Sequence, residues 1–222
     1  MPAPLLGKRT VTFDTEIKWT PTPALSMAAT ITRDSTLVYT LIVLPLFVLM
    51  GNLVAGAGIS GDLFRAAQAL ISRRRGGVAM ATVAACGAFG AICGSSVATA
   101  ATMGKVAIPE MRRLGYGDRL ASAAVAAGGT LGILIPPSVI MVVYGVATQT
   151  HIGKLFAAGI LPGLIAVVGY LLAVRYLVWR DPSQAPVTTE RLAMDVRGLV
   201  RTLWPVVAIF GVVMGGIYGG LF

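Results

Sequence analysis

The residues best suited to chemistry lie in a short stretch, Gly129 to Val139, that reads GTLGILIPPSV. Proline has no N–H, so Pro136 and Pro137 leave the carbonyls of Gly132 and Ile133 without their usual helix donors. A membrane interior cannot supply the missing hydrogen bonds, and such a break is tolerated only where it is buried in protein or lines an aqueous cavity. The stretch therefore predicts a discontinuous helix whose freed carbonyls meet a ligand or other protein groups.

Hydroxyl oxygens accompany the freed carbonyls at Thr130 and Ser138. Neutral oxygens suit a hard monovalent cation, and the broken helices of secondary transporters are where coupling cations bind. We therefore predict a cation site of the sodium type at this break. A simple kink is the alternative, because glycine and proline are frequent in membrane helices. The additional glycines Gly128, Gly129 and Gly132 favour the site.

A second candidate lies upstream in GAFGAICGSS, from Gly87 to Ser96, where glycines and serines interrupt an apolar segment. Glycine weakens helix continuity, so we predict two half-helices of about a dozen residues that meet at Gly94, Ser95 and Ser96. Close packing of small residues is the alternative for these serines and for Thr99. Two breaks in one chain favour a shared site, because inverted-repeat transporters build their sites from such elements.

The elements that must position these residues are long and apolar. The chain has 222 residues, 56% of them hydrophobic and 12% charged, with a mean hydropathy of +0.81, whereas soluble domains are roughly one quarter charged. We expect an all-α, polytopic membrane protein, because each apolar segment reaches the roughly 20 residues that a bilayer core requires. These segments are Thr36–Ala57, Val78–Met103, Leu120–Thr148, Leu155–Val178 and Leu203–Phe222.

The net charge of +9 does not indicate a nucleic-acid partner, because the basic residues cluster between the apolar segments, as in cytoplasmic loops. Arg75 precedes the segment Val78–Met103, and Arg112 and Arg119 follow it. A simple crossing would place one of these clusters on the wrong side, so we predict a re-entrant hairpin that enters and leaves from the cytoplasm. Gly61 to Arg75 is expected to form a helix at the cytoplasmic interface or against the bundle.

An enzyme is the competing class of function. Ser95 or Ser96 with His151 would make an intramembrane serine hydrolase. His151 is predicted on the outer side, and the sequence has neither a Gly-x-Ser-x-Gly elbow nor an evident acidic partner, which disfavours a hydrolase.

Cys86 and Cys93 share one apolar segment without metal-ligating neighbours. We therefore predict no transition-metal site and expect both cysteines to pack as small residues.

One long run of the sequence resembles a known family. The run ICGSSVATAATMGKVAIPEMRRLGYGDRLASAAVAAGGTLGILIPPSVIMVVYG and the later IGKLFAAGILPGL closely resemble the large membrane subunit of TRAP transporters, the tripartite ATP-independent periplasmic systems. The resemblance extends upstream through LPLFVLMGNLVAGAGI and downstream to WPVVAIFGVVMGGIYGGLF. It covers roughly Asp34 to Phe222.

The resemblance implies an elevator-type transporter, not an enzyme, that lies in a bacterial inner membrane and crosses it several times. It implies sodium-driven uptake of organic acids, such as C4-dicarboxylates or related carboxylates, with Na+ as the coupling ion and no other cofactor. A periplasmic substrate-binding protein would deliver the cargo, and a small TRAP membrane subunit would complete the complex in the lipid bilayer.

The family's site can be carried onto this sequence. Its first hairpin corresponds to Val78 to Lys105 and its first unwound helix to Gly129 to Ser138, and together they resemble the family's sodium half-site. We expect Ser95, Ser96 and Thr99 at the hairpin tip to contact the substrate as well.

The resemblance also implies the domain organisation. Residues 1–33 are expected to form a disordered leader that does not match the family, and residues 34–222 to form one half of an inverted-repeat permease. Family members continue with a second, inverted set of helices, so the substrate is expected to bind between the two halves. The alternative is a truncated membrane fragment that does not transport unless a separate polypeptide supplies the second half.

Overall fold

The computed structural model describes residues 25–28, 39–72, 75–186 and 196–219. Two units are distinguished, Met1–Val38 and Tyr39–Phe222. In the first unit, residues 25–28 form one helical turn with exposed side chains, and most of the predicted leader lies outside the described residues. The second unit is helical throughout its described part, without strands, which confirms the all-α prediction.

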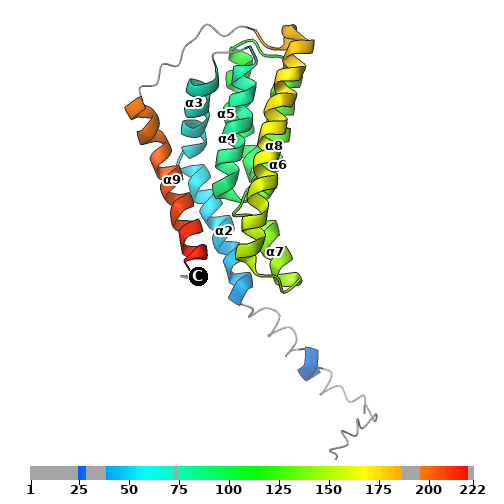
Figure 1. Cartoon of the computed structure of the whole chain (residues 1–222), viewed down its shortest axis with the longest axis vertical. Coiled ribbons are helices and arrows are strands. Elements are labelled where there is room, and N and C mark those ends of the chain that lie inside the picture. Colours follow the sequence, from blue (N-terminus) through cyan, green and yellow to red (C-terminus); the bar gives the residue numbers. More distant parts are fainter. Residues whose placement is uncertain (1–24, 29–38, 73–74, 187–195, 220–222) are drawn as a thin grey trace, which may run out of the picture. The chain divides into compact units, whose positions relative to one another are not determined.

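The helices of the second unit follow the apolar segments of the sequence (Figure 1). Along the chain they are α2 (Tyr39–Gly56), α3 (Ile59–Ile71), α4 (Gly77–Cys93), α5 (Ser96–Arg113), α6 (Asp118–Leu134), α7 (Val139–Ala147), α8 (Ile152–Arg180), the 3-10 turn η1 (Pro182–Gln184) and α9 (Val196–Tyr218).

Three stretches of the described chain are long and apolar enough to cross a membrane, as judged by length and composition. They are Asp118–Ala147, which joins α6 and α7 across their break, Ile152–Arg180 in α8 and Arg197–Tyr218 in α9. They correspond to the last three apolar segments predicted from the sequence. The first predicted segment corresponds to α2, an apolar helix of 18 residues.

The second predicted segment forms two helices, α4 and α5, that run antiparallel. The Tyr116 hydroxyl, just beyond the end of α5, accepts a hydrogen bond of 3.3 Å from the backbone N–H of Val78 at the start of α4. One turn further along α4, the Thr82 hydroxyl lies 3.5 Å from the Met111 sulfur. The start of α4 therefore lies beside the end of α5, and the chain reverses between them.

Both helices of this pair are longer than the half-helices of about a dozen residues that we expected. α4 has 17 residues and α5 has 18. α5 continues because Met103, Ala107 and Met111 recur at four-residue spacing and are all fully buried. Its last turn also carries Arg112 and Arg113, whose positive charges complement the C-terminal end of the helix dipole.

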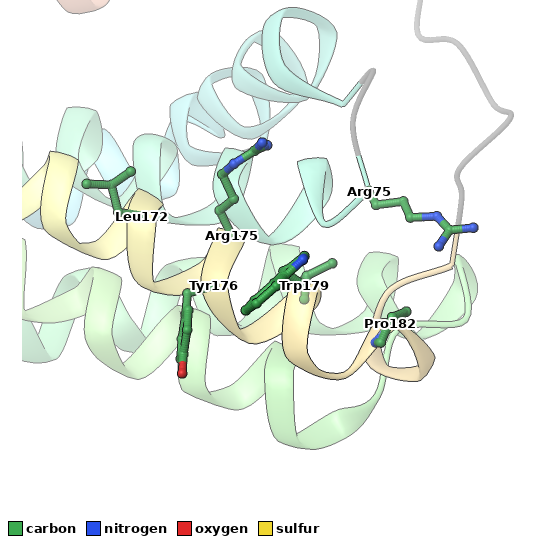
Figure 2. Close-up of a pocket in the computed structure, with 7 residues that line it drawn as sticks. Arg75, Leu172, Arg175, Tyr176, Trp179 and Pro182 are labelled. Carbon is green, nitrogen blue, oxygen red and sulfur yellow. The ribbon is translucent and has the colours of Figure 1, made fainter.

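Arginines from separate parts of the sequence collect at the end of the bundle where α4 begins. Arg75, just before α4, and Arg175, near the end of α8, line the same cavity (Figure 2). At the same end, the backbone N–H of Gly117 donates to the Gln184 carbonyl at 3.1 Å and joins the start of α6 to η1. Because α5 also ends here, Arg75 before α4 and the arginines in the last turn of α5 lie at one end of the bundle.

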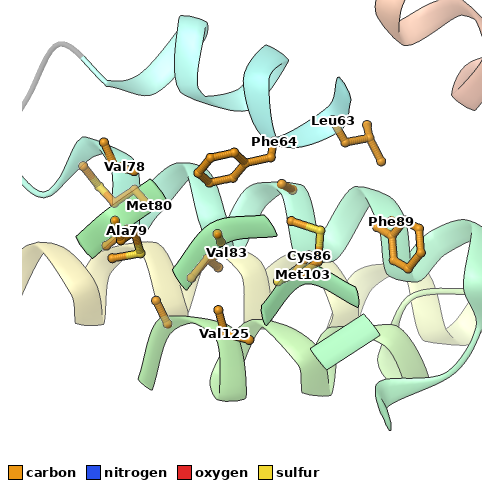
Figure 3. Close-up of a cluster of buried hydrophobic side chains, with 14 of the residues drawn as sticks. Leu63, Phe64, Val78, Ala79, Met80, Val83, Cys86, Phe89, Met103 and Val125 are labelled. Carbon is orange, nitrogen blue, oxygen red and sulfur yellow. The ribbon is translucent and has the colours of Figure 1, made fainter. Parts of the chain in front are cut away.

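The main core lies between α3, α4, α5 and α6 (Figure 3). Phe64 extends from α3 toward α4, and Cys86 and Phe89 of α4 are fully buried. α3 confirms the helix predicted between residues 61 and 75, although it begins at Ile59 and ends at Ile71. Leu70, near the end of this helix, is 60% exposed.

Candidate cation site at two helix breaks

The two helix breaks predicted from the sequence lie against each other. The carbonyl of Gly94, at the α4–α5 break, accepts a hydrogen bond of 3.2 Å from the backbone N–H of Val139, at the start of α7. A Cβ atom on Gly94 would lie only 2.8 Å from the carbonyl oxygen of Pro137. Four helix ends therefore meet at one junction: the C-terminal ends of α4 and α6 and the N-terminal ends of α5 and α7.

Glycines of α4 and α6 allow the backbones to approach closely at this junction. A Cβ atom on Gly132 would lie 2.7 Å from both the Ser95 carbonyl oxygen and the Thr99 hydroxyl. A Cβ atom on Gly90 would lie 2.6 Å from the Cα atom of Gly132. Side chains do not fit at such distances, so the spacing of these glycines brings the carbonyl end of α6 onto the hairpin tip.

The hairpin tip presents several polar oxygens. Ser95 caps α5, and its hydroxyl accepts a hydrogen bond of 3.4 Å from the backbone N–H of Ala98. The fully buried Thr99 donates its hydroxyl hydrogen to the Ser95 carbonyl at 2.7 Å. Ser95 and Ser96 are each partly buried. The tip residues singled out in the sequence therefore share one turn, next to Gly132 of α6.

Ser138 is the polar side chain that the second break brings to this junction. It is fully buried, and its hydroxyl has no hydrogen-bond partner among the described residues. It is the residue that precedes α7, yet it makes no side-chain cap. A buried hydroxyl without a partner costs about 1–3 kcal/mol. Its oxygen is therefore free to act as a ligand.

The break itself falls where the prolines predict it. α6 ends at Leu134, and the N–H of Ile135 still donates to the Leu131 carbonyl at 2.9 Å. Pro136 and Pro137 follow, both buried and joined by a cis peptide bond. Neither has an N–H to offer to the carbonyls of Gly132 and Ile133.

Thr130, predicted as a further ligand, lies elsewhere. Its hydroxyl donates to the Ala127 carbonyl at 2.7 Å and lies 3.0 Å from the Tyr170 hydroxyl of α8. Successive residues of a helix are turned by about 100°, so Thr130 cannot share the face on which Gly129 and Gly132 meet the hairpin. The structure brings Ser138 to the tip and leaves Thr130 on the α8 side.

Helix α8 supports the break from the other side, which our reading of the sequence missed. A Cβ atom on Gly159 would lie 2.6 Å from the Met141 Cε atom, and one on Gly163 would lie 3.0 Å from Ile135 Cγ1. Each would also lie 3.4 Å from the Leu134 carbonyl oxygen. The signal was present in the sequence as GILPG, two glycines four residues apart, which is typical of closely packed membrane helices.

The junction carries no full charge within the described part of the chain. The buried polar side chains of the described residues are all neutral, and Thr99 and Ser138 are the two of them that lie at the junction. Its electrostatics therefore come from helix ends, which carry about half an elementary charge each. The carbonyl ends of α4 and α6 attract a cation, and the N–H ends of α5 and α7 attract an anion.

The geometry does not assemble the serine hydrolase considered above. His151 precedes α8, next to Thr150, and the Thr150 carbonyl oxygen would lie 3.2 Å from a Cβ atom on Gly145. Gly145 lies about 9 Å along α7 from Val139, the residue that contacts the hairpin tip. This separation keeps the imidazole away from Ser95.

Comparison with known proteins identifies similar chains. The family described as "Tripartite ATP-independent periplasmic transporter, DctM component" matches residues 9–222, a range that begins within the segment we assigned to a leader. The chain is 41% identical over 184 residues to the C4-dicarboxylate TRAP transporter large permease protein DctM of Pseudomonas aeruginosa. The aligned region covers 83% of this chain and 43% of that protein.

Two further relatives are named for other cargoes. The ectoine/5-hydroxyectoine TRAP transporter large permease protein UehC of Ruegeria pomeroyi is 36% identical over 187 residues, covering 82% of this chain and 42% of that protein. The sialic acid TRAP transporter permease protein SiaT of Haemophilus influenzae is 29% identical over 216 residues, covering 96% of this chain and 34% of that protein. The chain spans less than half the length of each of these relatives.

Proposed function

This chain belongs to the DctM family of the tripartite ATP-independent periplasmic transporters, and on that premise we propose that it forms part of a permease that imports an organic acid across a bacterial inner membrane. The driving force is a sodium gradient, a periplasmic binding protein delivers the cargo, and a small membrane subunit completes the complex. Relatives are named for C4-dicarboxylates, ectoine and sialic acid. We propose a C4-dicarboxylate or a related carboxylate as the cargo here.

The observation that carries the sodium proposal is the junction of the two helix breaks. The Ser138 hydroxyl is buried there without a partner among the described residues, close to the hairpin tip. The carbonyls of Gly132 and Ile133 lack their helix donors beside it. In the proposed site these oxygens and those of Gly94, Ser95 and Ser96 surround Na+, with the carbonyl ends of α4 and α6 adding favourable dipoles.

The same junction supports recognition of an anionic substrate. The N-terminal ends of α5 and α7 both lie there, and the backbone N–H groups of such ends favour a carboxylate. Ser95, Ser96 and Thr99 add hydroxyl groups on the same side. Since the buried polar side chains of the described chain are all neutral, a charged clamp for the substrate would come from elsewhere in the permease.

We further propose that α4 and α5 form a re-entrant hairpin within residues 34–222, which are one half of an inverted-repeat elevator. Two features support this. The arginines on either side of the pair share one end of the bundle, so both ends of the hairpin fit the same face of the membrane. α4 has 17 residues, or about 25 Å of helix, which is shorter than the roughly 30 Å hydrocarbon core.

Uptake by the complete reconstituted permease, supplied with its binding protein, tests the proposal. We expect accumulation with an inward sodium gradient and none in potassium-only buffer. Ser138→Ala should raise the sodium concentration for half-maximal uptake about tenfold, because a ligand to a charged ion is lost. Thr130→Ala is the matched control and should leave that concentration unchanged, since its hydroxyl lies on the α8 side.

Two results would count against the proposal. Equal uptake in potassium-only buffer would remove the sodium coupling, and an unchanged sodium dependence in Ser138→Ala would remove this residue from the site. Measuring the stability of Ser138→Ala shows whether the variant is folded when its sodium dependence is compared. Because the Ser138 hydroxyl has no hydrogen-bond partner to lose in the described part of the chain, Ser138→Ala should be at least as stable as the unmodified chain.

A further inference from the structure

A cavity unrelated to the helix breaks lies at the basic end of α8. It has a volume of about 490 Å³ and lies between the start of α4 and the last turns of α8 (Figure 2). Its lining includes Arg75, Leu172, Arg175, Tyr176 and Trp179. In Figure 2 the Trp179 ring lies between the two arginines, and Tyr176 extends from the opposite side of α8.

The cavity has a wall that close helix packing keeps in place. Val178 of α8 lines it and is 5% exposed. Gly76 has a φ of +76°, and a Cβ atom on it would lie 2.7 Å from Val178 Cγ2. The glycine therefore allows α8 to touch the turn that leads into α4. This contact holds Arg75 and the end of α8 side by side.

The two arginines of the cavity are available to an anion. Neither forms an ion pair with a carboxylate of the described chain, in which the ion pairs are made by Arg65, Arg112 and Arg113. Asp181 is the acidic residue next to the lining, but its carboxylate accepts hydrogen bonds from Ser183 and Gln184 in η1. The cavity thus presents two guanidinium groups, which match phosphate oxygens in geometry and charge.

An exposed apolar stripe runs along α8 to this cavity. Its members recur at spacings of three or four residues and all lie more than half exposed; they are Leu161, Ile165, Val168, Leu172, Tyr176 and Trp179. The stripe belongs to a helix apolar enough to cross a membrane. Tryptophan and tyrosine at the end of such a helix are typical of the membrane–water interface.

We propose that this cavity binds the headgroup of an anionic phospholipid, with an acyl chain along the α8 stripe. The phosphate lies between Arg75 and Arg175 at the interface, and the chain follows Leu172 toward the middle of the membrane. Basic pockets between membrane helices on the cytoplasmic side are suited to such headgroups. An apolar polypeptide helix on the same face would bury both guanidinium groups without a carboxylate, which is costly.

Quenching of Trp179 fluorescence by brominated lipids tests this binding site. Trp19 and Trp204 are replaced by phenylalanine so that Trp179 is the single reporter, and the chain is placed in bilayers. At equal mole fraction, brominated phosphatidylglycerol should quench Trp179 more strongly than brominated phosphatidylcholine. Inorganic phosphate in the buffer should not remove this preference, because the acyl chain contributes to binding.

Substitutions assign the preference to the cavity. Arg75→Gln and Arg175→Gln should each weaken the preference for phosphatidylglycerol about fivefold, as expected for one basic residue near a membrane surface. Arg75→Lys should largely retain it, because the charge remains. Arg112→Gln is the matched control: it removes an arginine from the same end of the bundle but from the pair with Asp118, so the preference should persist.

Several outcomes would overturn the proposal. Equal quenching by the two lipids would show that the cavity does not select charge, and an intact preference in the double glutamine variant would place the selection elsewhere. Loss of the preference in inorganic phosphate would indicate a site for free phosphate. If neither lipid quenched Trp179, another polypeptide would cover this face. Circular dichroism of each variant confirms that its helices are retained.

Discussion

Replacing Gly94 by alanine tests the contact between the two helix breaks most directly. Gly94 has a φ of +63°, in the left-handed region, and its carbonyl accepts the hydrogen bond from Val139. A Cβ atom here would also lie 2.8 Å from the Pro137 carbonyl oxygen. Alanine at this position therefore meets two separate penalties, one from backbone conformation and one from the contact with the second break.

The two penalties have known magnitudes. A residue with a Cβ atom in the left-handed region costs about 1–2 kcal/mol. Overpacking against an element that cannot move freely costs about 1–3 kcal/mol. Gly94→Ala should therefore lower the free energy of unfolding by about 2–5 kcal/mol, and it should weaken the packing of the hairpin tip on α7.

Three glycine variants serve as controls because each isolates one part of this reasoning. Gly58 has a φ of +78° but open space around its Cβ position, so Gly58→Ala carries the conformational cost alone. Gly132→Ala carries only the clash, at 2.7 Å from Ser95 and Thr99. Gly104→Ala has neither, since its Cβ atom would make ordinary contacts with Val125 and Ile108.

The free energy of unfolding of each variant, measured by denaturant titration in mixed micelles, separates these terms. Gly58→Ala and Gly132→Ala should each be less destabilised than Gly94→Ala. Gly104→Ala should be more stable than the unmodified chain by about 0.5–1 kcal/mol, because alanine is the better helix former. If Gly94→Ala were no less stable than Gly58→Ala, the hairpin tip would not touch the second break, and the proposed site would lose its geometry.

Two further predictions concern the basic end of the bundle. Tyr116→Phe removes the acceptor for the Val78 N–H, and it should lower the free energy of unfolding by about 1 kcal/mol; an unchanged value would show that water replaces the hydroxyl. Hydrogen bonds from Ser183 and Gln184 hold the pKa of Asp181 below its ordinary value of 3.8. The carboxylate therefore contributes stability at neutral pH that is lost as the pH falls below about 4. Asp181→Asn should flatten this part of the pH profile of unfolding, and an identical profile would contradict the assignment.

Much of the fold could be predicted because membrane helices leave a strong local signal. The last three apolar segments coincide with stretches long enough to cross a membrane, since such a helix must cover the bilayer and satisfy its own backbone. The distribution of arginines also predicted that α4 and α5 would reverse direction. The length of α5 was underestimated because Met103, Ala107 and Met111 lie beyond the most apolar part of the segment, where burial depends on neighbouring helices.

The candidate site was predicted in part. The positions of the two breaks, at Gly94 and at Pro136 and Pro137, follow from residues that disfavour helix continuation wherever they occur. The selection of ligand oxygens was less successful, because Thr130 and Ser138 both offer a hydroxyl within the same interrupted stretch of sequence. Only the packing against the hairpin and α8 separates them.

The sequence by itself therefore determined that this chain is a bundle of membrane helices with two interruptions, because helix length and proline chemistry are local properties. The tertiary structure alone decided that the interruptions touch, that Ser138 faces the junction, and that Arg75 and Arg175 share one cavity. These contacts join residues far apart in the chain. They depend on which side of each helix its glycines bring against a neighbour, which is a property of the packed bundle.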